Sequence, residues 1–506
     1  MNKINEKERP EHIPCSLTKA LDAFHQMFKD CDDLIETEMY LGRERTIRCQ
    51  IIYIEIAVQG ITLSHSQIGT LLTSLSDSRD EEVLPRIKKN ALGLSGAKKL
   101  VTFQDVSRTI LAGDAVLFVD GFNGALKLPD RGYPNMGITE CEAEKVSRGS
   151  KEGFADSIKA NTALLRKRLR TPELKIKQTI LGEHSNTLVN LVYLQGIARE
   201  SLLREMEKKL ASFEIDAVTD TGILEQLTEG CWYSPFPQFQ TTERPDLAVE
   251  ALLEGRIVLL SDNSPVALIL PTDFNCFLKT SDDRFNRFEA ATFSRWIRYF
   301  AAFFALSLPG LYLAAVLFQA NLLPLDLLLS FSDARAGVPF SPLAEMLLME
   351  LSFELLREAG IRLPGNMGNT MGIVGGLIIG QAAVEANLVS PIVVIVTAFT
   401  ALCSFAIPNE EFAFAFRMLK YVMMVISGVF GWFGFCFSLL TVWFHLTHLK
   451  SFGIPFLTPF AAGDLNHERD LRDSIFRAPI FLMKWRSFYA REGRRRRYRE
   501  KTGEKS

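Results

Sequence analysis

The stretch YFAAFFALSLPGLYLAAVLFQANLLPL, Tyr299–Leu325, runs for 27 residues without an Asp, Glu, Lys or Arg. A helix needs about 20 apolar residues to cross the hydrocarbon core of a bilayer, and backbone groups in lipid must be satisfied internally. Three later charge-free runs, of 22, 24 and 29 residues, are also long enough: Leu363–Val384, Ala386–Asn409 and Tyr421–Leu449. We therefore predict an all-α polytopic membrane domain with about four spans, and regard a large soluble helical core as the weaker alternative.

Basic residues flank these runs on both sides. Four arginines lie within Arg284–Arg298, before the first run, and ten Lys and Arg lie within Lys484–Lys505. The positive-inside rule then places both ends of the chain in the cytosol, which four crossings satisfy. Trp296, Tyr299 and Trp443 lie where interfacial anchors are expected. The basic tail is interpreted as a topology signal, with contact to anionic lipid as the alternative.

Between the first two runs, SPLAEMLLMELSFELLREAG (Ser341–Gly360) is apolar but contains several acidic residues. Glu350, Glu354 and Arg357 follow i, i+4, i+7 spacing on one helical face. Charges are costly in lipid, so this helix is expected to be interfacial, re-entrant or packed inside a bundle, and an ordinary amphipathic surface helix remains open. In a channel, Glu350 and Glu354 would attract cations near one mouth.

The second run contains a stripe of glycines at every fourth residue, which allows another backbone to approach closely in a membrane. A second line, polar at both ends and apolar in the middle, lies roughly opposite. Such a helix can line an ion pathway, although Gln381 and Glu385 could instead bond to each other or to a neighbouring helix. The packing residues are Gly368, Gly372, Gly376 and Gly380, and the pore-lining residues are Thr370, Val374, Ile378, Gln381 and Glu385.

The composition of the 506 residues excludes several classes of protein. Lys plus Arg (57) nearly balances Asp plus Glu (59), which argues against a globally basic nucleic-acid binder. Eight well-separated cysteines give neither a zinc site nor a disulfide framework, so no metal or other cofactor is expected. The charged N-terminus lacks the apolar region of a signal peptide, which favours a cytosolic start.

The first 295 or so residues alternate between strand and helix patterns. The sequence contains a weak internal repeat. The segments CQIIYIEI and LAGDAVLFVDGFNGAL are similar to LVNLVYLQGI and LLEGRIVLLSDNSPVAL, and the two segments of each copy are separated by nearly the same number of residues, which indicates two similar α/β subdomains in tandem. The expected strands are Cys49–Ala57, Ala115–Asp120, Leu188–Gly196, Arg256–Leu260 and Val266–Leu270, and the expected helices include Asp156–Arg170 and Ala198–Phe213.

No catalytic motif is present in the sequence. GxSxG, Walker, HExxH and GxGxxG patterns are absent, and the seven histidines are scattered. The chain is therefore not expected to be an enzyme. The basic cluster Arg166, Lys167, Arg168 and Arg170 lacks interleaved aromatic residues, so no nucleic-acid partner is expected.

Several segments together resemble the GerA family of spore germination proteins, and specifically their A subunit. The resemblance covers most of the chain from about residue 110 to 460. The segments are SRGSKEGFADSIKANTALLRKRLRTPELK (Ser147–Lys175), TTERPDLAVEALLEGRIVLLSDNSPVALILP (Thr241–Pro271), IVGGLIIGQAAVEANLVSP (Ile373–Pro391), SFAIPNEEFAFAFRMLK (Ser404–Lys420) and SFGIPFLTP (Ser451–Pro459).

This resemblance implies a subunit of a nutrient receptor in the spore inner membrane. Such a subunit works with a transporter-like B subunit and a lipoprotein C subunit, and oligomerises into a nutrient-gated monovalent cation channel. A membrane-anchored scaffold that assembles the receptor without conducting ions is the alternative. Subunit contacts are expected at Arg148, Gly149, Glu152, Gly153, Phe154, Arg244, Pro245 and Asp246.

The predicted domain boundaries follow from these patterns. Residues 1–145 and 146–293 form two cytosolic α/β subdomains, residues 294–450 form the transmembrane domain, and residues 451–506 form a basic cytosolic tail.

Overall fold

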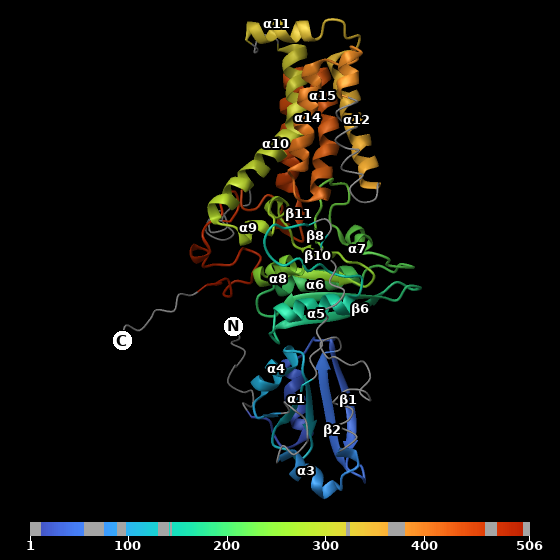
Figure 1. Cartoon of the computed structure of the whole chain (residues 1–506), viewed down its shortest axis with the longest axis vertical. Coiled ribbons are helices and arrows are strands. Elements are labelled where there is room, and N and C mark those ends of the chain that lie inside the picture. Colours follow the sequence, from blue (N-terminus) through green and yellow to red (C-terminus); the bar gives the residue numbers. More distant parts are fainter. Residues whose placement is uncertain are drawn as a thin grey trace, which may run out of the picture. The chain divides into compact units, whose positions relative to one another are not determined.

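The computed structural model of the protein divides into two compact units (Figure 1). The first comprises Met1–Glu229, Phe239–Pro271 and Lys484–Ser506, and the second comprises Gly230–Gln238 and Thr272–Met483. The structure describes residues 12–54, 75–88, 98–129, 141, 144–319, 324–362, 380–460 and 473–498.

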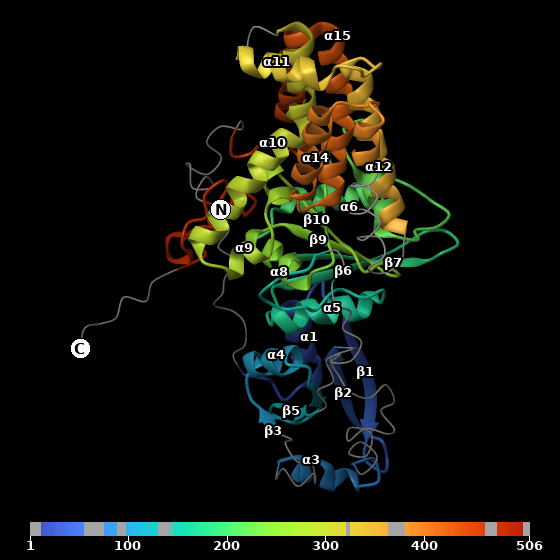
Figure 2. The same cartoon turned by 45° about the horizontal axis from the view of Figure 1, so that its top comes forward.

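A five-stranded antiparallel sheet of order β1-β2-β4-β5-β3 begins the first unit. Successive side chains of its second strand, β2, point to opposite faces of the sheet, and both faces are covered by helices. Ile52 packs with α1 and α4, whereas Ile51 packs with α3 on the other face. Figure 2 shows α1 and α4 near one end of this sheet and α3 near the other. The elements are α1 (Leu17–Met27), β1 (Leu34–Leu41), β2 (Ile47–Ile54), α3 (Asp80–Lys88), β3 (Lys98–Leu100), α4 (Phe103–Leu111), β4 (Ala115–Val119) and β5 (Ala125–Leu128).

A second five-stranded antiparallel sheet follows, of order β6-β7-β9-β10-β8. Numbered along the chain, its strands are arranged in the same order as those of the first sheet. Helices α5 and α8 pack on one face with apolar residues of β7, β9 and β10. The elements are α5 (Ile158–Arg168), β6 (Leu174–Leu181), β7 (Thr187–Leu194), α6 (Glu200–Leu210), α7 (Thr221–Thr228), β8 (Gln240–Thr242), α8 (Pro245–Glu254), β9 (Ile257–Ser261) and β10 (Ala267–Leu270).

The α/β class predicted for this region is confirmed. The expected strands coincide with β2, β4, β7, β9 and β10, and the two expected helices coincide with α5 and α6. Strands β1, β3, β5, β6 and β8 were not predicted. Strands β3, β5 and β8 span only three or four residues, and about half of the residues of β1 and β6 are polar.

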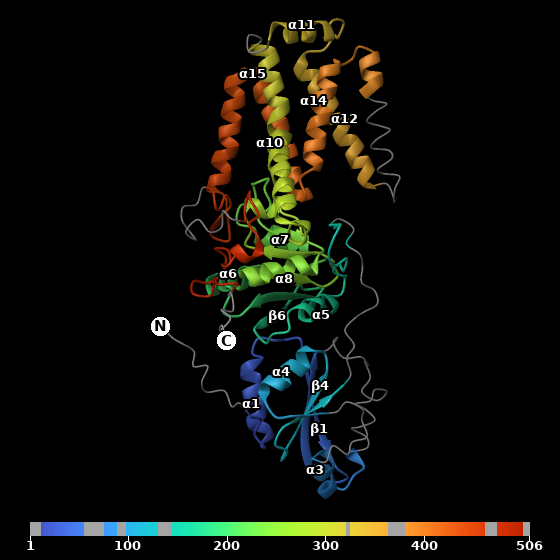
Figure 3. The ribbon, with the colours of Figure 1, turned by 60° about the vertical axis from the view of Figure 1, so that its left-hand side comes forward.

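The second unit is mainly helical (Figure 3). Helices α10, α12, α14 and α15 pack together, and α11 lies across one end of the group. The elements are η1 (Phe274–Leu278), α9 (Asp282–Phe285), α10 (Phe288–Phe318), α11 (Leu325–Ala334), α12 (Pro342–Arg362), α14 (Pro391–Phe405), α15 (Glu410–His448), β11 (Lys450–Ser451), β12 (Ile454–Pro455) and η4 (Ile480–Leu482).

Two helices among the described residues, α10 and α15, are long and apolar enough to cross a membrane. The third predicted run gives the shorter apolar helix α14, of 15 residues. The second predicted run lies largely outside the described residues, so the number of spans stays a prediction. The acidic segment Ser341–Gly360 is helical, within α12.

Helix α15 is not one straight rod, because its backbone reverses at Gly431, where φ is 62° and ψ is −140°. The rings of Phe412 and His445 both lie close to the ring of Phe236, with centroids 5.8 and 6.1 Å away. In a straight helix, the 33-residue separation of Phe412 and His445 would place them about 50 Å apart. The fourth predicted run therefore belongs to two antiparallel helices, and the prediction of a single span there is wrong.

Candidate functional site

Charged side chains lie inside the helical unit, and α12 provides several of them. Glu345 and Glu350 are buried, together with Met346 and Met349, whereas the leucines on the opposite side of the helix are exposed. Buried carboxylates are tolerated only when they are paired or hydrogen-bonded. Glu345 and Glu350 therefore face the bundle, and Leu348, Leu351 and Leu355 face outward.

Glu350 forms an ion pair with Lys420 of α15. The Glu350 carboxylate lies 2.5 Å from the Lys420 ammonium, and both side chains are almost fully buried. The Tyr421 hydroxyl donates a hydrogen bond of 3.1 Å to the backbone carbonyl of Glu350. These contacts tie α12 to the first half of α15.

A second ion-pair group lies along the same two helices. The Arg417 guanidinium contacts Glu354 at 3.2 Å and Glu410 at 2.9 Å. Arg357 lies 3.8 Å from Glu410 and stacks over the Phe405 ring at 4.2 Å. The two acidic residues of α12 at i, i+4 spacing thus face two basic residues of α15 at i, i+3 spacing.

Glu345 forms a third polar site between α12 and α14. Its side chain is 0% exposed, and its carboxylate accepts a 2.9 Å hydrogen bond from the Ser390 backbone amide. The Arg335 guanidinium lies 3.4 Å from the same carboxylate.

The predicted pore helix is described only at its C-terminal end. Gln381 donates a 2.9 Å hydrogen bond to Glu385, and both side chains are exposed. Gly380 and Ala383 are buried in the same stretch, and a Cβ on Gly380 would lie 3.4 Å from Cγ1 of Val394 in α14. The remaining predicted residues of this helix lie outside the described residues: Gly368, Thr370, Gly372, Val374, Gly376 and Ile378.

Glu350 and Glu354 were predicted to be acidic groups at a channel mouth. Each carboxylate is paired with a cation of α15, and Glu350 is buried. The structure of the single chain therefore gives both residues a helix-packing partner. Their role at a mouth stays a prediction.

Most of the residues predicted to make subunit contacts also have partners within their own unit. Arg244 is buried and binds Asp246 through two hydrogen bonds of 3.0 and 2.7 Å, and its Nη2 donates to the Ser150 carbonyl at 2.7 Å. Glu152 pairs with Lys167 at 2.7 Å. Phe154 and Pro245 are buried, Gly149 has a φ of 124°, and Arg148 and Gly153 lie in the same loop.

Two carboxyl groups beside this loop have shifted pKa values. Burial raises the pKa of Glu144, although its hydrogen bonds from Thr242 and the Glu243 amide oppose the shift. For Glu152 the effect of burial is outweighed, and Lys167 and Arg168 hold its pKa below the ordinary value. The loop is thus fastened to α5 and α8 by charged contacts.

Lys420, Arg417 and Glu345 are site residues that the sequence analysis missed. Lys420 immediately precedes the charge-free run that begins at Tyr421, and the sequence analysis gave it no role. The complementary spacing of acids on α12 and bases on α15 was a usable signal. A group of three exposed side chains that could hold a metal ion, Glu183, His184 and Asp216, was also not predicted, but exposed groups of this kind are common without a metal.

Comparison with known proteins gives several extensive matches. A family profile described as "Bacillus/Clostridium GerA spore germination protein" matches residues 22–489. The chain is 36% identical over 483 residues to the "Uncharacterized membrane protein YfkQ" of Bacillus subtilis, covering 95% of this chain and 93% of that protein. It is 34% identical over 474 residues to "Spore germination protein KA" of the same species, covering 94% and 86%.

One solved structure is also similar in sequence. It is the N-terminal domain of the A subunit of the Bacillus megaterium spore germinant receptor GerK3, which is 28% identical to the matched part of this chain. The match covers 53% of this chain and 99% of that domain, with a TM-score of 0.41.

Proposed function

The chain belongs to the Bacillus/Clostridium GerA family of spore germination proteins, and from this premise we propose that it is the A subunit of a nutrient receptor in the spore inner membrane. It acts as a multi-pass membrane protein whose two ends are cytosolic. Its partners are further copies of itself, a transporter-like B subunit and a lipoprotein C subunit. Nutrient binding opens the oligomer to monovalent cations.

The two-faced helix that ends in Gly380–Glu385 is the observation that supports conduction most directly. Its small residues are buried against α14, and Gln381 and Glu385 are exposed on the other side. An oligomer that gathers these exposed polar faces around one axis has a polar lumen, and Val374 and Ile378 supply an apolar constriction that opens by wetting. The exposed leucines of α12 are available for contact with lipid or a neighbouring subunit.

The first unit is assigned to assembly of the receptor. The shared strand order of its two sheets supports two similar α/β subdomains in tandem. Coupling to the channel requires that the nutrient-bound receptor favour the open arrangement, because a ligand shifts an equilibrium only through its differential affinity.

Nutrient-triggered release of monovalent cations from spores tests the conduction path. Spores carrying Glu385→Ala should release cations more slowly than wild type. Spores carrying Gly380→Leu should also release them more slowly, because the larger side chain disturbs the packing of this helix against Val394 of α14. Glu358→Ala, which removes an exposed carboxylate of α12, is the matched control and should behave like wild type.

Normal release in both test variants would remove this helix as the conduction path. A second measurement separates the channel from the scaffold: purified protein in liposomes should support K⁺ efflux without substrate exchange. A receptor that assembles normally but shows no such flux, alone or with its partners, would favour the membrane-anchored scaffold.

A further inference from the structure

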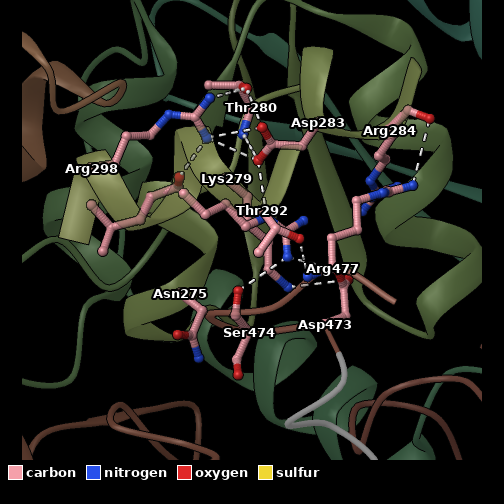
Figure 4. A network of polar contacts seen from close by, with 12 residues as sticks. Asn275, Lys279, Thr280, Asp283, Arg284, Thr292, Arg298, Asp473, Ser474 and Arg477 are labelled. Atoms are coloured by element: carbon pink, nitrogen blue, oxygen red, sulfur yellow. Dashed lines mark hydrogen bonds and ion pairs between the residues drawn. The ribbon is translucent and has the colours of Figure 1, made fainter. Parts of the chain in front are cut away.

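A network of buried ion pairs lies at the base of α10 (Figure 4). The Arg295 guanidinium, which is almost fully buried, lies 3.1 Å from the Asp283 carboxylate and 2.9 Å from that of Asp473. Arg298 adds a 2.9 Å contact to Asp283, and Lys279 lies 3.3 Å from Asp473. Arg298 and Arg295 hold the pKa of Asp283 below its ordinary value against the effect of burial. Against the effect of burial, Lys279 and Arg295 likewise hold the pKa of Asp473 below its ordinary value, so both aspartates are anionic at neutral pH.

This network fastens a distant C-terminal segment, residues 473–483, to α10. Arg295 Nη1 donates to the Ser474 carbonyl at 3.0 Å, and the Arg477 backbone amide donates to the Thr292 hydroxyl at 3.2 Å. The segment is thus held in place by contacts with residues about 180 positions earlier in the chain. Its position does not depend on its own short 3₁₀ helix, η4.

The opposite side of α10 presents an apolar stripe. Phe293, Trp296, Ile297 and Phe300 follow i, i+3, i+4, i+7 spacing, so they share one helical face, and they are 47% to 63% exposed. The stripe begins before the charge-free run that starts at Tyr299, in a stretch whose arginines point inward.

The fastened segment enlarges this apolar surface. The Phe476 ring packs edge-on against the Trp296 ring, with centroids 5.4 Å apart. Ile480, Phe481 and Leu482 are 62%, 60% and 45% exposed. Large apolar side chains exposed in this number on two segments that contact each other normally mark an interaction site.

We propose that this surface, formed by the outer face of residues 293–300 and by residues 476–482, lies in the headgroup–acyl boundary of the bilayer. The segment 473–483 is then a membrane-interface anchor, not part of a cytosolic tail. This inference rests on the proposed membrane location of α10.

Continuity and charge together favour a lipid surface as the occupant. The stripe continues along α10 into exposed Phe303, within the apolar part of the helix, so a bilayer that surrounds the helix also meets the stripe. Exposed aromatic side chains at the end of an apolar helix are typical of membrane interfaces. Residues 279–300 and 473–483 contain six Lys and Arg and four Asp and Glu, an excess of cations that suits lipid phosphate groups.

Quenching of tryptophan fluorescence by brominated lipids tests the proposal on the full chain in liposomes. The contribution of Trp296 is obtained by comparing wild type with Trp296→Phe, and Phe481→Trp adds a reporter in the anchor. We expect lipids brominated near the headgroup to quench both reporters on the order of twofold, and more than lipids brominated near the chain ends.

Two reference variants make the outcomes distinct. Phe433→Trp reports from a strongly exposed position in α15, and Tyr40→Trp reports from an exposed strand position in the first unit, where no quenching is expected. If Phe433→Trp is quenched but Trp296 and Phe481→Trp are not, the anchor is overturned and the membrane domain stands. If Phe433→Trp is also unquenched, both proposals fail. If Trp296 and the Trp of Phe481→Trp become shielded from quenching only when the protein oligomerises, another copy of the chain is the occupant, and the lipid proposal is overturned.

Discussion

The Lys420 ammonium of α15 lies 2.5 Å from the Glu350 carboxylate of α12, in the interior of the helical unit. Removing one partner of a buried ion pair leaves an uncompensated charge and costs about 3–5 kcal/mol, whereas replacing both by apolar groups is often nearly neutral. We therefore expect Glu350→Met and Lys420→Met each to lower the thermal unfolding midpoint of the detergent-solubilised chain. The double variant should recover most of the loss.

The control for this cycle is Glu358→Met, an exposed acidic position on the same helix. It should leave the unfolding midpoint nearly unchanged. Additive losses in the double variant would contradict the pairing, and Glu350 would then be free to act as a cation-attracting group at a mouth.

Arg166 of α5 makes a different buried ion pair, with Asp33 before β1, through two parallel hydrogen bonds of 2.8 Å. Lysine cannot reproduce this two-pronged contact. Arg166→Lys should therefore speed hydrogen–deuterium exchange in β1 and α5. Arg166→Met should speed it more, because losing the pair lowers the free energy of local opening by about 3–5 kcal/mol.

Arg204→Lys is the matched control for Arg166, because Arg204 is exposed and lies 3.9 Å from Glu200 one turn away on the same helix. Exposed pairs of this kind contribute about 0.3–0.5 kcal/mol, so exchange should hardly change. Equal exchange in the Arg166 and Arg204 variants would mean that the Asp33 contact does not hold the two α/β regions together.

The parts of the fold that could be predicted from the sequence are those with a local apolar signal. Strands β4 and β9 are continuous buried runs, AVLFV and IVLLS, and both were expected. Strands β1 and β6 are edge strands of their sheets, and sequences such as LIETEMYL read equally well as loop. Their pairing is decided by the neighbouring strand and not by their own composition.

The candidate site was less predictable because its contacts join distant residues. Glu350 and Lys420 are 70 residues apart, and the matching charge spacing of their two helices does not by itself say that these helices pack against each other. The turn at Gly431 is also hidden, since it lies within a charge-free apolar run and glycine is common in membrane helices. By contrast, helical periodicity alone predicts a small-residue face at Gly380 and a polar face at Gln381. In the described part of that helix, Gly380 is buried and Gln381 is exposed, as predicted.

The cysteines predict a simple labelling pattern. Cys15 is exposed, whereas Cys49 of β2 is buried, and burial raises the pKa of the Cys49 thiol to about 12. Only the thiolate reacts with alkylating reagents, and a raised pKa leaves Cys49 protonated at pH 8. Iodoacetamide should therefore modify Cys15 within minutes and leave Cys49 unmodified, as read by peptide mass spectrometry.

Denaturation provides the control for this labelling. In urea, both cysteines should react at similar rates, because the unfolded chain restores an ordinary thiol pKa. Rapid modification of Cys49 in the native chain would contradict its burial between the first sheet and α3.

The reversal at Gly431 predicts a strong sensitivity to a single methyl group. A Cβ on Gly431 would lie 2.6 Å from Cγ of Phe318, in a backbone conformation (φ 62°, ψ −140°) that costs a non-glycine residue about 1–3 kcal/mol. Gly337 is the matched control, since its φ is 95° but a Cβ there meets nothing within 4 Å. Gly431→Ala should therefore lower the thermal unfolding midpoint well beyond Gly337→Ala, because the Phe318 ring must move as well. Equal midpoints would mean that Phe318 of α10 and the turn at Gly431 do not pack as closely as the structure has them. The two halves of α15 would then be held together only near Phe236, by the contacts of Phe412 and His445 with its ring.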